Sequence, residues 1–276
     1  MLEIFSISDI GGRASQQDVI AALHDVAGIA CGLVLCDGAG GLADGDKAAQ
    51  LTCDACHAAI AQHSLQGLSS DPLRILGDAI AVSQRHVQSL DSDYCASTVT
   101  MALIAPPYAF IAWVGDSPVW LYSDRCLIRI SSSHGLPQEQ WRAYQISGQE
   151  LGNHEQSNVI TRAINKGSGI WSPDMRAITV KSGDQLILAS DGLDAVLTDE
   201  EIEKVLNTRR ENTSSGEIVQ TLIDAALARN TSDNVSVGVI RVLDPTSHAP
   251  EIPATPAVWG AIYDHLHSQQ ESDYVA

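Results

Sequence analysis

The order of apolar and polar segments predicts an α+β fold in which an antiparallel sandwich of strands is covered by helices. Two observations support this prediction. Most of the predicted elements are strands, and the helical segments occur as two neighbouring pairs instead of alternating with the strands. Regular alternation would favour βαβ units and a parallel sheet. At 276 residues, the chain is long enough to bury a sizeable core.

The elements are assigned from hydrophobic patterns and from the residues that begin or end them. The helix that begins at Asp71-Pro72, for example, has a favourable N-cap and a proline suited to the first helical position. Turn-forming residues dominate 131–173, where irregular structure with short helices is expected. In chain order we expect strands over 3–10 and 31–37, an Ala-rich helix over 43–63, a helix from 71 to about 90, strands over 97–105 and 108–115 joined at Pro106-Pro107, a hairpin of 119–122 and 126–130, strands over 176–180 and 184–190, helices over 199–206 and 215–228, and a last strand over 234–242.

The stretch around Asp37 organises the rest of the chain. The apolar run Leu33-Val34-Leu35-Cys36 ends in this carboxylate, and three glycines follow within four positions. This pattern is typical of a buried strand that stops at an acidic turn, where glycine lets the main chain approach a ligand. The same pattern ends in Asp191-Gly192, and Asp233 precedes the last predicted strand. Three strand-end carboxylates can converge on one hard cation, since oxygen ligands suit Mg²⁺ or Mn²⁺.

The charge of the chain limits the classes of partner. The sequence holds 34 acidic and 16 basic residues, a formal net charge of −18. This balance argues against a nucleic-acid or anionic-membrane surface, which needs a basic face. A site for an anionic substrate must therefore build its own positive charge from a metal or a well-placed arginine.

The N-terminus has no charged n-region and h-region, and no apolar run approaches the roughly 18 residues of a membrane helix, so a cytoplasmic location is expected. Six cysteines fit free thiols better than a disulfide framework. Cys53-Asp54-Ala55-Cys56-His57 matches the haem-attachment string and leaves haem or zinc as alternatives, although buried thiols in a helix explain it more simply. Prolines in 244–276 predict a linker and tail outside a catalytic domain of 1–243, with a short helix over 257–267.

Six motifs, taken together and in order, resemble those of the metal-dependent type-2C (PPM) serine/threonine protein phosphatases of bacterial type. The motifs are Arg13-x-x-Gln16-Gln17-Asp18, Asp37-Gly38-Ala39-Gly40-Gly41, Gly115-Asp116-Ser117, Asn158-Val159-Ile160-Thr161-Arg162-Ala163, Ser190-Asp191-Gly192 and Asp233-Asn234. Each motif alone is weak, because Asp-Gly and Asp-Asn are common turn dipeptides. The resemblance implies a four-layer α-β-β-α sandwich, two antiparallel sheets flanked by helix pairs.

The resemblance also implies a role for each site residue. Asp37 would bridge two Mg²⁺ or Mn²⁺ ions, and the Gly38 carbonyl would bind one of them. Asp191 and Asp233 would complete the protein ligands of the other ion. Asp18 would lie close by and hold metal-bound waters. Asp116 would bind a possible third ion, and Arg13 would bind the substrate phosphate. The region 133–173 would be the variable flap beside the active site.

The chemistry is consistent with these roles. Two ions roughly 3.5–4 Å apart lower the pKa of a bridging water and hold phosphoryl oxygens in line. Arg13 offers a planar fork that matches two phosphate oxygens. The expected reaction is hydrolysis of phosphoserine or phosphothreonine in a phosphorylated protein substrate, by direct attack of a metal-bridging hydroxide and without a phosphoenzyme. The expected protein is a monomer.

Three positions depart from the family pattern. Gln16 stands where bacterial members usually have Asn, Ser133 where they often have Asp before a residue like His134, and Ala39 where animal members have His. Neither Gln16 nor Ser133 is at a metal-bridging position, so these two departures concern the fine geometry of the site more than catalysis. Because Ala39 stands where the animal members have a histidine proposed as general acid, the leaving-group proton is expected to come from water. The alternative is a catalytically weak, phosphatase-like module that binds a phosphorylated partner. His134 is expected to be structural.

Overall fold

The computed structural model describes residues 2–24, 31–39, 44–62, 71–92, 94–151, 154–156, 159–167, 172–208 and 213–243. The predicted linker and tail over 244–276, with the helix expected over 257–267, lie outside these residues, as do Gly40, Gly41 and Asn158 of the motifs.

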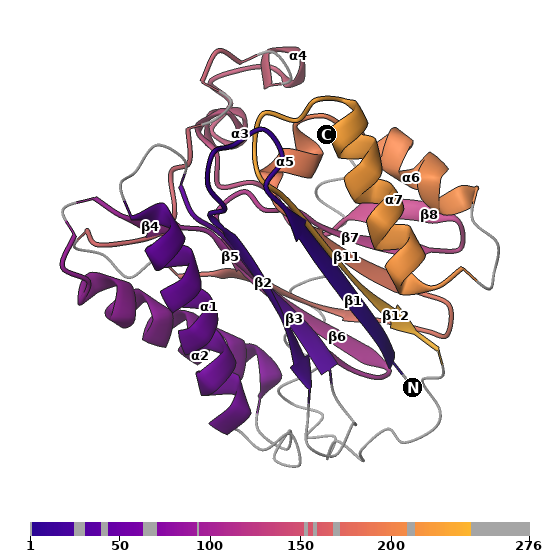
Figure 1. The fold of residues 1–276 in the computed structure, drawn as a ribbon, viewed down its shortest axis with the longest axis horizontal. Coiled ribbons are helices and arrows are strands. Elements are labelled where there is room, and N and C mark those ends of the chain that lie inside the picture. The colour runs from indigo at the N-terminus through magenta and orange to yellow at the C-terminus, as the bar shows by residue number, and fades with distance from the viewer. Residues whose placement is uncertain are drawn as a thin grey trace.

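Two five-stranded antiparallel sheets form the centre of the molecule (Figure 1). The first sheet has the order β1-β12-β11-β7-β8, and the second β10-β6-β5-β3-β2. The bounds in the first sheet are β1 Leu2–Asp9, β12 Val235–Val242, β11 Gln185–Ala189, β7 Val119–Ser123 and β8 Cys126–Arg129. Those in the second are β10 Asp174–Thr179, β6 Tyr108–Val114, β5 Val99–Ala105, β3 Cys31–Asp37 and β2 Asp18–His24.

Helices cover the outer face of each sheet, so the predicted four layers are confirmed (Figure 1). Helices α1 (Gly45–Gln62) and α2 (Pro72–Gln88) pack on the second sheet, and α6 (Asp199–Asn207) and α7 (Ser215–Ala228) pack on the first. A third apolar cluster lies between the sheets and includes Leu33 and Ile111 from one and Leu188 and Ile240 from the other.

Strand β3 is buried on both faces, which explains its unbroken apolar run. Leu33 and Leu35 belong to the cluster between the sheets, whereas Val34 and Cys36 pack toward the helices. Because side chains alternate along a strand, Asp37 takes the next inward position. The strand therefore delivers a carboxylate to one end of the space between the sheets.

The predicted helix starts are confirmed. The Asp71 carboxylate accepts hydrogen bonds from the backbone nitrogens of Leu73 and Arg74, at 3.1 and 3.4 Å, with Pro72 in the first turn of α2. Capping boxes begin α6 at Thr198 and α7 at Ser214. No helix in the described part of the chain has the length and apolar character needed to cross a membrane.

Three features differ from the sequence prediction. Strand β2 was not predicted, because Ala21 and Ala22 in its middle have low strand propensity. The strand expected over 97–105 is two elements: Ser97 pairs in a small sheet of β4 (Ala96–Ser97) and β9 (Ile164–Asn165), and β5 begins after Thr98. The four-residue helix α5 (Asp191–Asp194) was predicted only as a turn; the region 131–173 contains the short helices α3 (Leu136–Arg142) and α4 (Gly148–Leu151).

Candidate active site

Five aspartates from both sheets gather at one end of the sandwich. Asp18 and Asp37 lie at the adjoining ends of β2 and β3, and Asp116 follows β6. Asp191 is the first residue of α5, after β11, and Asp233 precedes β12. Helix α5 lies beside the loop that joins β1 to β2, at this same end of the molecule (Figure 1). The charges of these aspartates raise one another's pKa values, so the side chains interact electrostatically.

Asp18 and Asp37 stand directly opposite each other in the register of β2 and β3. Like charges in this position destabilise a sheet. Burial raises the pKa of Asp37 well above its ordinary value, and the neighbouring charges of Asp18, Asp191 and Asp116 raise it further. Burial also raises the pKa of Asp18 to about 6, against hydrogen bonds from the hydroxyls of Ser190 and Ser236. The pair therefore favours a bound cation or proton.

Asp116 is held in the turn that follows β6. Gly115 has a φ of +117°, a conformation that other residues avoid, and a Cβ there would lie 2.6 Å from the Thr98 side chain. The Thr98 hydroxyl accepts a hydrogen bond from the Asp37 backbone nitrogen at 3.0 Å and lies 2.8 Å from the Ser117 hydroxyl. The turn is thus tied to the end of β3. Burial, followed by the charge of Asp191, raises the pKa of Asp116 to about 7.

Asp191 is positioned by close packing of its neighbour, Gly192. A Cβ on Gly192 would lie 1.9 Å from the Asn234 carbonyl oxygen, so only glycine permits this approach of α5 to β12. Burial and the charge of Asp233 raise the pKa of Asp191, whereas a hydrogen bond with Asp37 and the charge of Arg13 oppose this rise.

Arg13 and Asp233 form an ion pair. The Arg13 Nε and Nη2 atoms donate to the two carboxylate oxygens of Asp233 at 2.7 and 2.5 Å. The guanidinium is also close enough to Asp191 and Asp37 for their charges to raise its pKa. Arg13 is thus the cation that accompanies the acidic cluster in this structure.

Asn234 organises the loop that carries Arg13, a role that the sequence did not indicate beyond its place in a motif. Its amide nitrogen donates to the carbonyls of Ile10 and Ser15 at 2.9 and 3.0 Å, and its oxygen accepts from the Gln17 nitrogen at 2.8 Å. Position 38 requires glycine because of packing, which the sequence also did not indicate. A Cβ there would lie 2.3 Å from the Gly45 carbonyl oxygen.

The acidic side chains are of the type that binds divalent cations, but they are not yet arranged around one. Among the described residues, no group of three or more His, Cys, Asp or Glu side chains is arranged to hold a metal ion as it stands. The Arg13 ion pair engages the Asp233 carboxylate. However, Asp18 Oδ2 and Asp116 Oδ1 are buried and have no hydrogen-bond partner in the described part of the chain. Buried carboxylate oxygens that lack partners and repel one another suit a hard cation such as Mg²⁺ or Mn²⁺.

His134 is a structural residue, as expected. Its ring is fully buried, stacks on Trp113, and accepts a hydrogen bond at Nδ1 from the Gly115 nitrogen at 3.1 Å. That bond places the ring proton on Nε2, which lies 3.4 Å from the Asp174 carboxylate. His134 therefore links the region 133–173 to the turn that carries Asp116.

The two cysteines of the haem-like string are buried thiols of helix α1. Cys53 and Cys56 are buried in the α1 core and, like Cys36, Cys95 and the exposed Cys126, have free thiols. Burial raises the pKa of Cys56 to about 12. The expectation of free thiols is confirmed for these five.

Comparison with known proteins identifies the family. A family model described as "Protein phosphatase 2C" matches residues 8–228, and the chain belongs to this family. It is 25% identical over 244 residues to the protein phosphatase PhpP of Streptococcus pneumoniae, covering 87% of this chain and 97% of PhpP.

Solved structures agree with this assignment. A serine/threonine phosphatase of S. agalactiae aligns with a TM-score of 0.79 and 28% identity, covering 88% of this chain and 100% of the other. The catalytic domain of the phosphatase PstP, solved in complex with two manganese ions, aligns with a TM-score of 0.74 and 28% identity, covering 88% of this chain and 99% of the other. The fold and the family predicted from the motifs are confirmed.

Proposed function

We propose that this protein removes phosphate from phosphoserine and phosphothreonine in proteins with the help of divalent cations. One observation carries the proposal: aspartates from both sheets share a partly buried cluster, and the partly exposed fork of Arg13 pairs with one of them, Asp233. The family match and the phosphatase names of the relatives support it.

The carboxylates of Asp37, Asp191 and Asp233 and the carbonyl of Gly38 would hold two Mg²⁺ or Mn²⁺ ions, and Asp116 a possible third. When bound, such ions supply a nucleophilic water near neutral pH and neutralise the phosphoryl charge. Asp18 would accept hydrogen bonds from water in the site through its unpartnered Oδ2.

Arg13 would exchange partners during substrate binding. Its guanidinium pairs with Asp233 through the same planar fork that matches two phosphate oxygens. Once Asp233 has another cation, Arg13 is free to bind the substrate phosphate and orient it. Ala39 carries no proton donor, so the leaving hydroxyl would take its proton from water.

Phosphate release from a phosphothreonine peptide, with and without Mn²⁺, tests this function. We expect release that depends on Mn²⁺, that is abolished by EDTA, and that is much slower with the matched phosphotyrosine peptide. Folded protein that releases no phosphate with Mn²⁺ or Mg²⁺ would overturn the proposal.

A second candidate is a module that binds a phosphorylated partner without turnover. The partly exposed Arg13 side chain favours it, because a guanidinium fork can bind a phosphate without a metal, and the described residues include no group of acidic side chains arranged to hold a metal ion. Calorimetric titration separates the two functions: this module would bind the phosphopeptide but not Mn²⁺. A catalytic unit of 1–243, a cytoplasmic location and a monomeric state remain predictions.

A further inference from the structure

Helix α5, which carries Asp191, is too short to fix its own orientation. It has four residues, with Asp191 at its start and Asp194 at its end. An isolated helical turn is unstable in water, so its direction depends on tertiary contacts. Any contact that holds α5 therefore also aims the Asp191 carboxylate.

The start of α5 is held by backbone packing. The Ser190 hydroxyl accepts a hydrogen bond from the Ser236 nitrogen at 3.0 Å, and the Thr231 hydroxyl donates to the Gly192 carbonyl at 2.9 Å. These contacts fix where the helix begins. Leu193, the third residue of the helix, is fully buried in the core beneath it. The polar end of the helix is held through Asp194.

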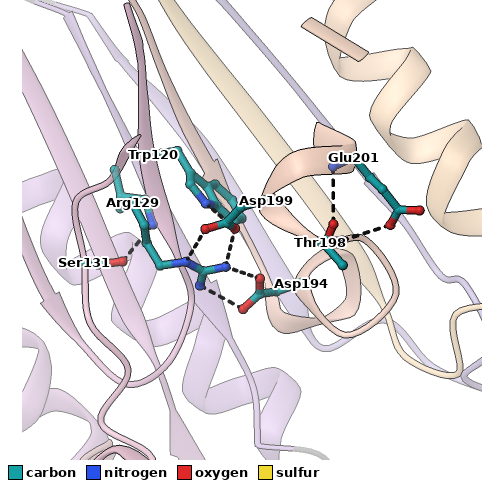
Figure 2. A network of polar contacts seen from close by, with 8 residues as sticks. Trp120, Arg129, Ser131, Asp194, Thr198, Asp199 and Glu201 are labelled. Carbon is teal, nitrogen blue, oxygen red and sulfur yellow. Dashed lines mark hydrogen bonds and ion pairs between the residues drawn. The ribbon is translucent and has the colours of Figure 1, made fainter. Parts of the chain in front are cut away.

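Arg129, at the end of β8, holds Asp194 through two hydrogen bonds (Figure 2). Its Nη1 and Nη2 atoms donate to the two carboxylate oxygens of Asp194 at 2.9 and 2.5 Å. The same guanidinium donates to both oxygens of Asp199 at the start of α6, at 3.2 Å from Nε and 2.6 Å from Nη2.

Arg129 is itself fixed from the core side. Its guanidinium carbon lies 4.9 Å from the centroid of the buried Trp120 ring, whose Nε1 donates to Asp199 at 2.9 Å (Figure 2). Lysine cannot reproduce this arrangement, since an ammonium group is a point charge without a planar fork. The network thus connects the core of the first sheet rigidly to the end of α5.

Asp194 also lies close enough to the acidic cluster for its charge to act on Asp191 and Asp116. A change in its position would therefore be felt at both carboxylates. Arg129 keeps this neighbour paired and directed away from the cluster, toward β8.

We infer that Arg129 is a positioning residue for the active site: by binding Asp194 it holds the end of α5 in place, and thereby keeps the Asp191 carboxylate directed toward divalent cations. This inference rests on the proposed function, in which Asp191 is a metal ligand. Arg129 touches neither substrate nor cation in this role.

Matched lysine substitutions test the inference without changing charge. Arg129→Lys keeps the positive charge but loses the fork, and Arg229→Lys is its control. Arg229 lines the same cavity of about 390 Å³ as Arg129, but it pairs with Glu201 of α6 instead of Asp194. It also donates to the Val196 carbonyl, just after α5, at 3.0 Å, so the control separates the contact with Asp194 from other contacts near this helix. Calorimetric titration with Mn²⁺ gives Kd, and thermal unfolding in EDTA gives Tm, for the full chain.

We expect Arg129→Lys to weaken Mn²⁺ binding about tenfold, the lower end of the effect of removing an outer-sphere partner. Arg229→Lys should keep the wild-type Kd, even if its Tm falls. An unchanged Kd in Arg129→Lys, or an equal loss in both variants, would overturn the inference.

If Arg129→Lys does not fold, Asp199→Asn decides the question. It removes one anchor of the guanidinium but leaves Arg129 and Asp194 in place, and we expect a smaller weakening of Mn²⁺ binding, about twofold. A wild-type Kd in that variant would overturn the inference. A wild-type chain that binds no Mn²⁺ would instead overturn the proposed function, and the role of Arg129 with it.

Discussion

Two acidic regions of the molecule use the same residue type in opposite ways. Around Arg129, Asp194 and Asp199 share a guanidinium, and hydrogen bonds to Arg129 hold the pKa of Asp199 below its ordinary value despite partial burial. Around Asp37, burial and mutual repulsion raise the pKa values, and two buried carboxylate oxygens lack partners among the described residues.

The difference lies in whether the protein itself supplies partners for the carboxylates of a cluster. In the cluster around Arg129, both carboxylates accept hydrogen bonds from one guanidinium, so the protein itself supplies their partner. A cluster with too little positive charge costs stability unless a cation or a proton enters it. In this protein the two clusters meet at α5: Asp191, at its start, interacts with the cluster around Asp37, and Asp194, at its end, belongs to the cluster around Arg129.

The largest expected effect compares one aspartate from each region. Asp191→Asn should reduce phosphate release at saturating Mn²⁺ by about a thousandfold or more, since a metal ligand contributes several kcal/mol to the transition state. Asp199→Asn should stay within about threefold of wild type, because saturation hides a small loss of affinity. Steady-state kinetics with circular dichroism as a folding control measures both. Equal losses would remove the distinction between the regions.

A substitution of Arg13 tests whether this arginine, unlike Arg129, exchanges its carboxylate partner for a ligand. Arg13→Ala should lower kcat/KM about 10- to 100-fold, because charge-assisted hydrogen bonds contribute roughly 1.5–3 kcal/mol. Its affinity for Mn²⁺ should not fall, since Asp233 loses a competing partner. Kinetics and calorimetry on the same preparation measure the two quantities. A parallel loss of Mn²⁺ affinity would contradict the proposed exchange.

The acidic cluster should make the metal-free protein sensitive to pH. The pKa values of Asp18 and Asp116 rise in the folded state, to about 6 and about 7. Because raised carboxyl pKa values favour folding only while the groups are protonated, the free energy of unfolding should fall as pH rises from about 4 to 7. Urea unfolding in EDTA should show a loss on the order of 5 kcal/mol, since a tenfold change in proton affinity corresponds to about 1.4 kcal/mol.

Two controls sharpen that measurement. Asp116→Asn should make the pH dependence shallower, because it removes one of the carboxyl groups with a raised pKa. Saturating Mn²⁺ should also flatten it by neutralising the carboxylates. A metal-free stability that rises steadily over this range would show that the cluster is not strained by its own charge.

The smallest expected effect concerns the cysteine thiols, which are uncharged when buried. The Cys56 thiol is neutral at pH 8, since burial raises its pKa to about 12, so it should not react with a thiol reagent in the native protein. Exposed Cys126 should react rapidly, and Cys126→Ser should remove this reaction while phosphate release stays unchanged. Rapid labelling of Cys56, identified by mass spectrometry, would contradict its buried position.

The features that could be predicted from the sequence are those marked by a local pattern of residues. Asp37 and Asp191 could be identified because each follows an apolar run and precedes glycine, and the start of α2 because Asp71-Pro72 is a local signal. The edge strand β2 was missed because alanines fill its centre. Helix α5 was missed because four residues show no helical period.

Contacts between distant segments could not be predicted from one sequence. Arg129 meets Asp194 and Asp199 at separations of 65 and 70 residues, and no local pattern marks these three as partners. The same holds for Arg13 and Asp233, which are 220 residues apart. The predicted motifs supplied candidate residues, and the fold supplied their pairing.

The Asn234 side chain has a practical consequence for engineering. Three hydrogen bonds join this amide to the segment that bears Arg13, although the two belong to opposite ends of the described chain. Transplanting the first loop from a relative would move Arg13 without its anchor. A working chimera must therefore import both pieces together.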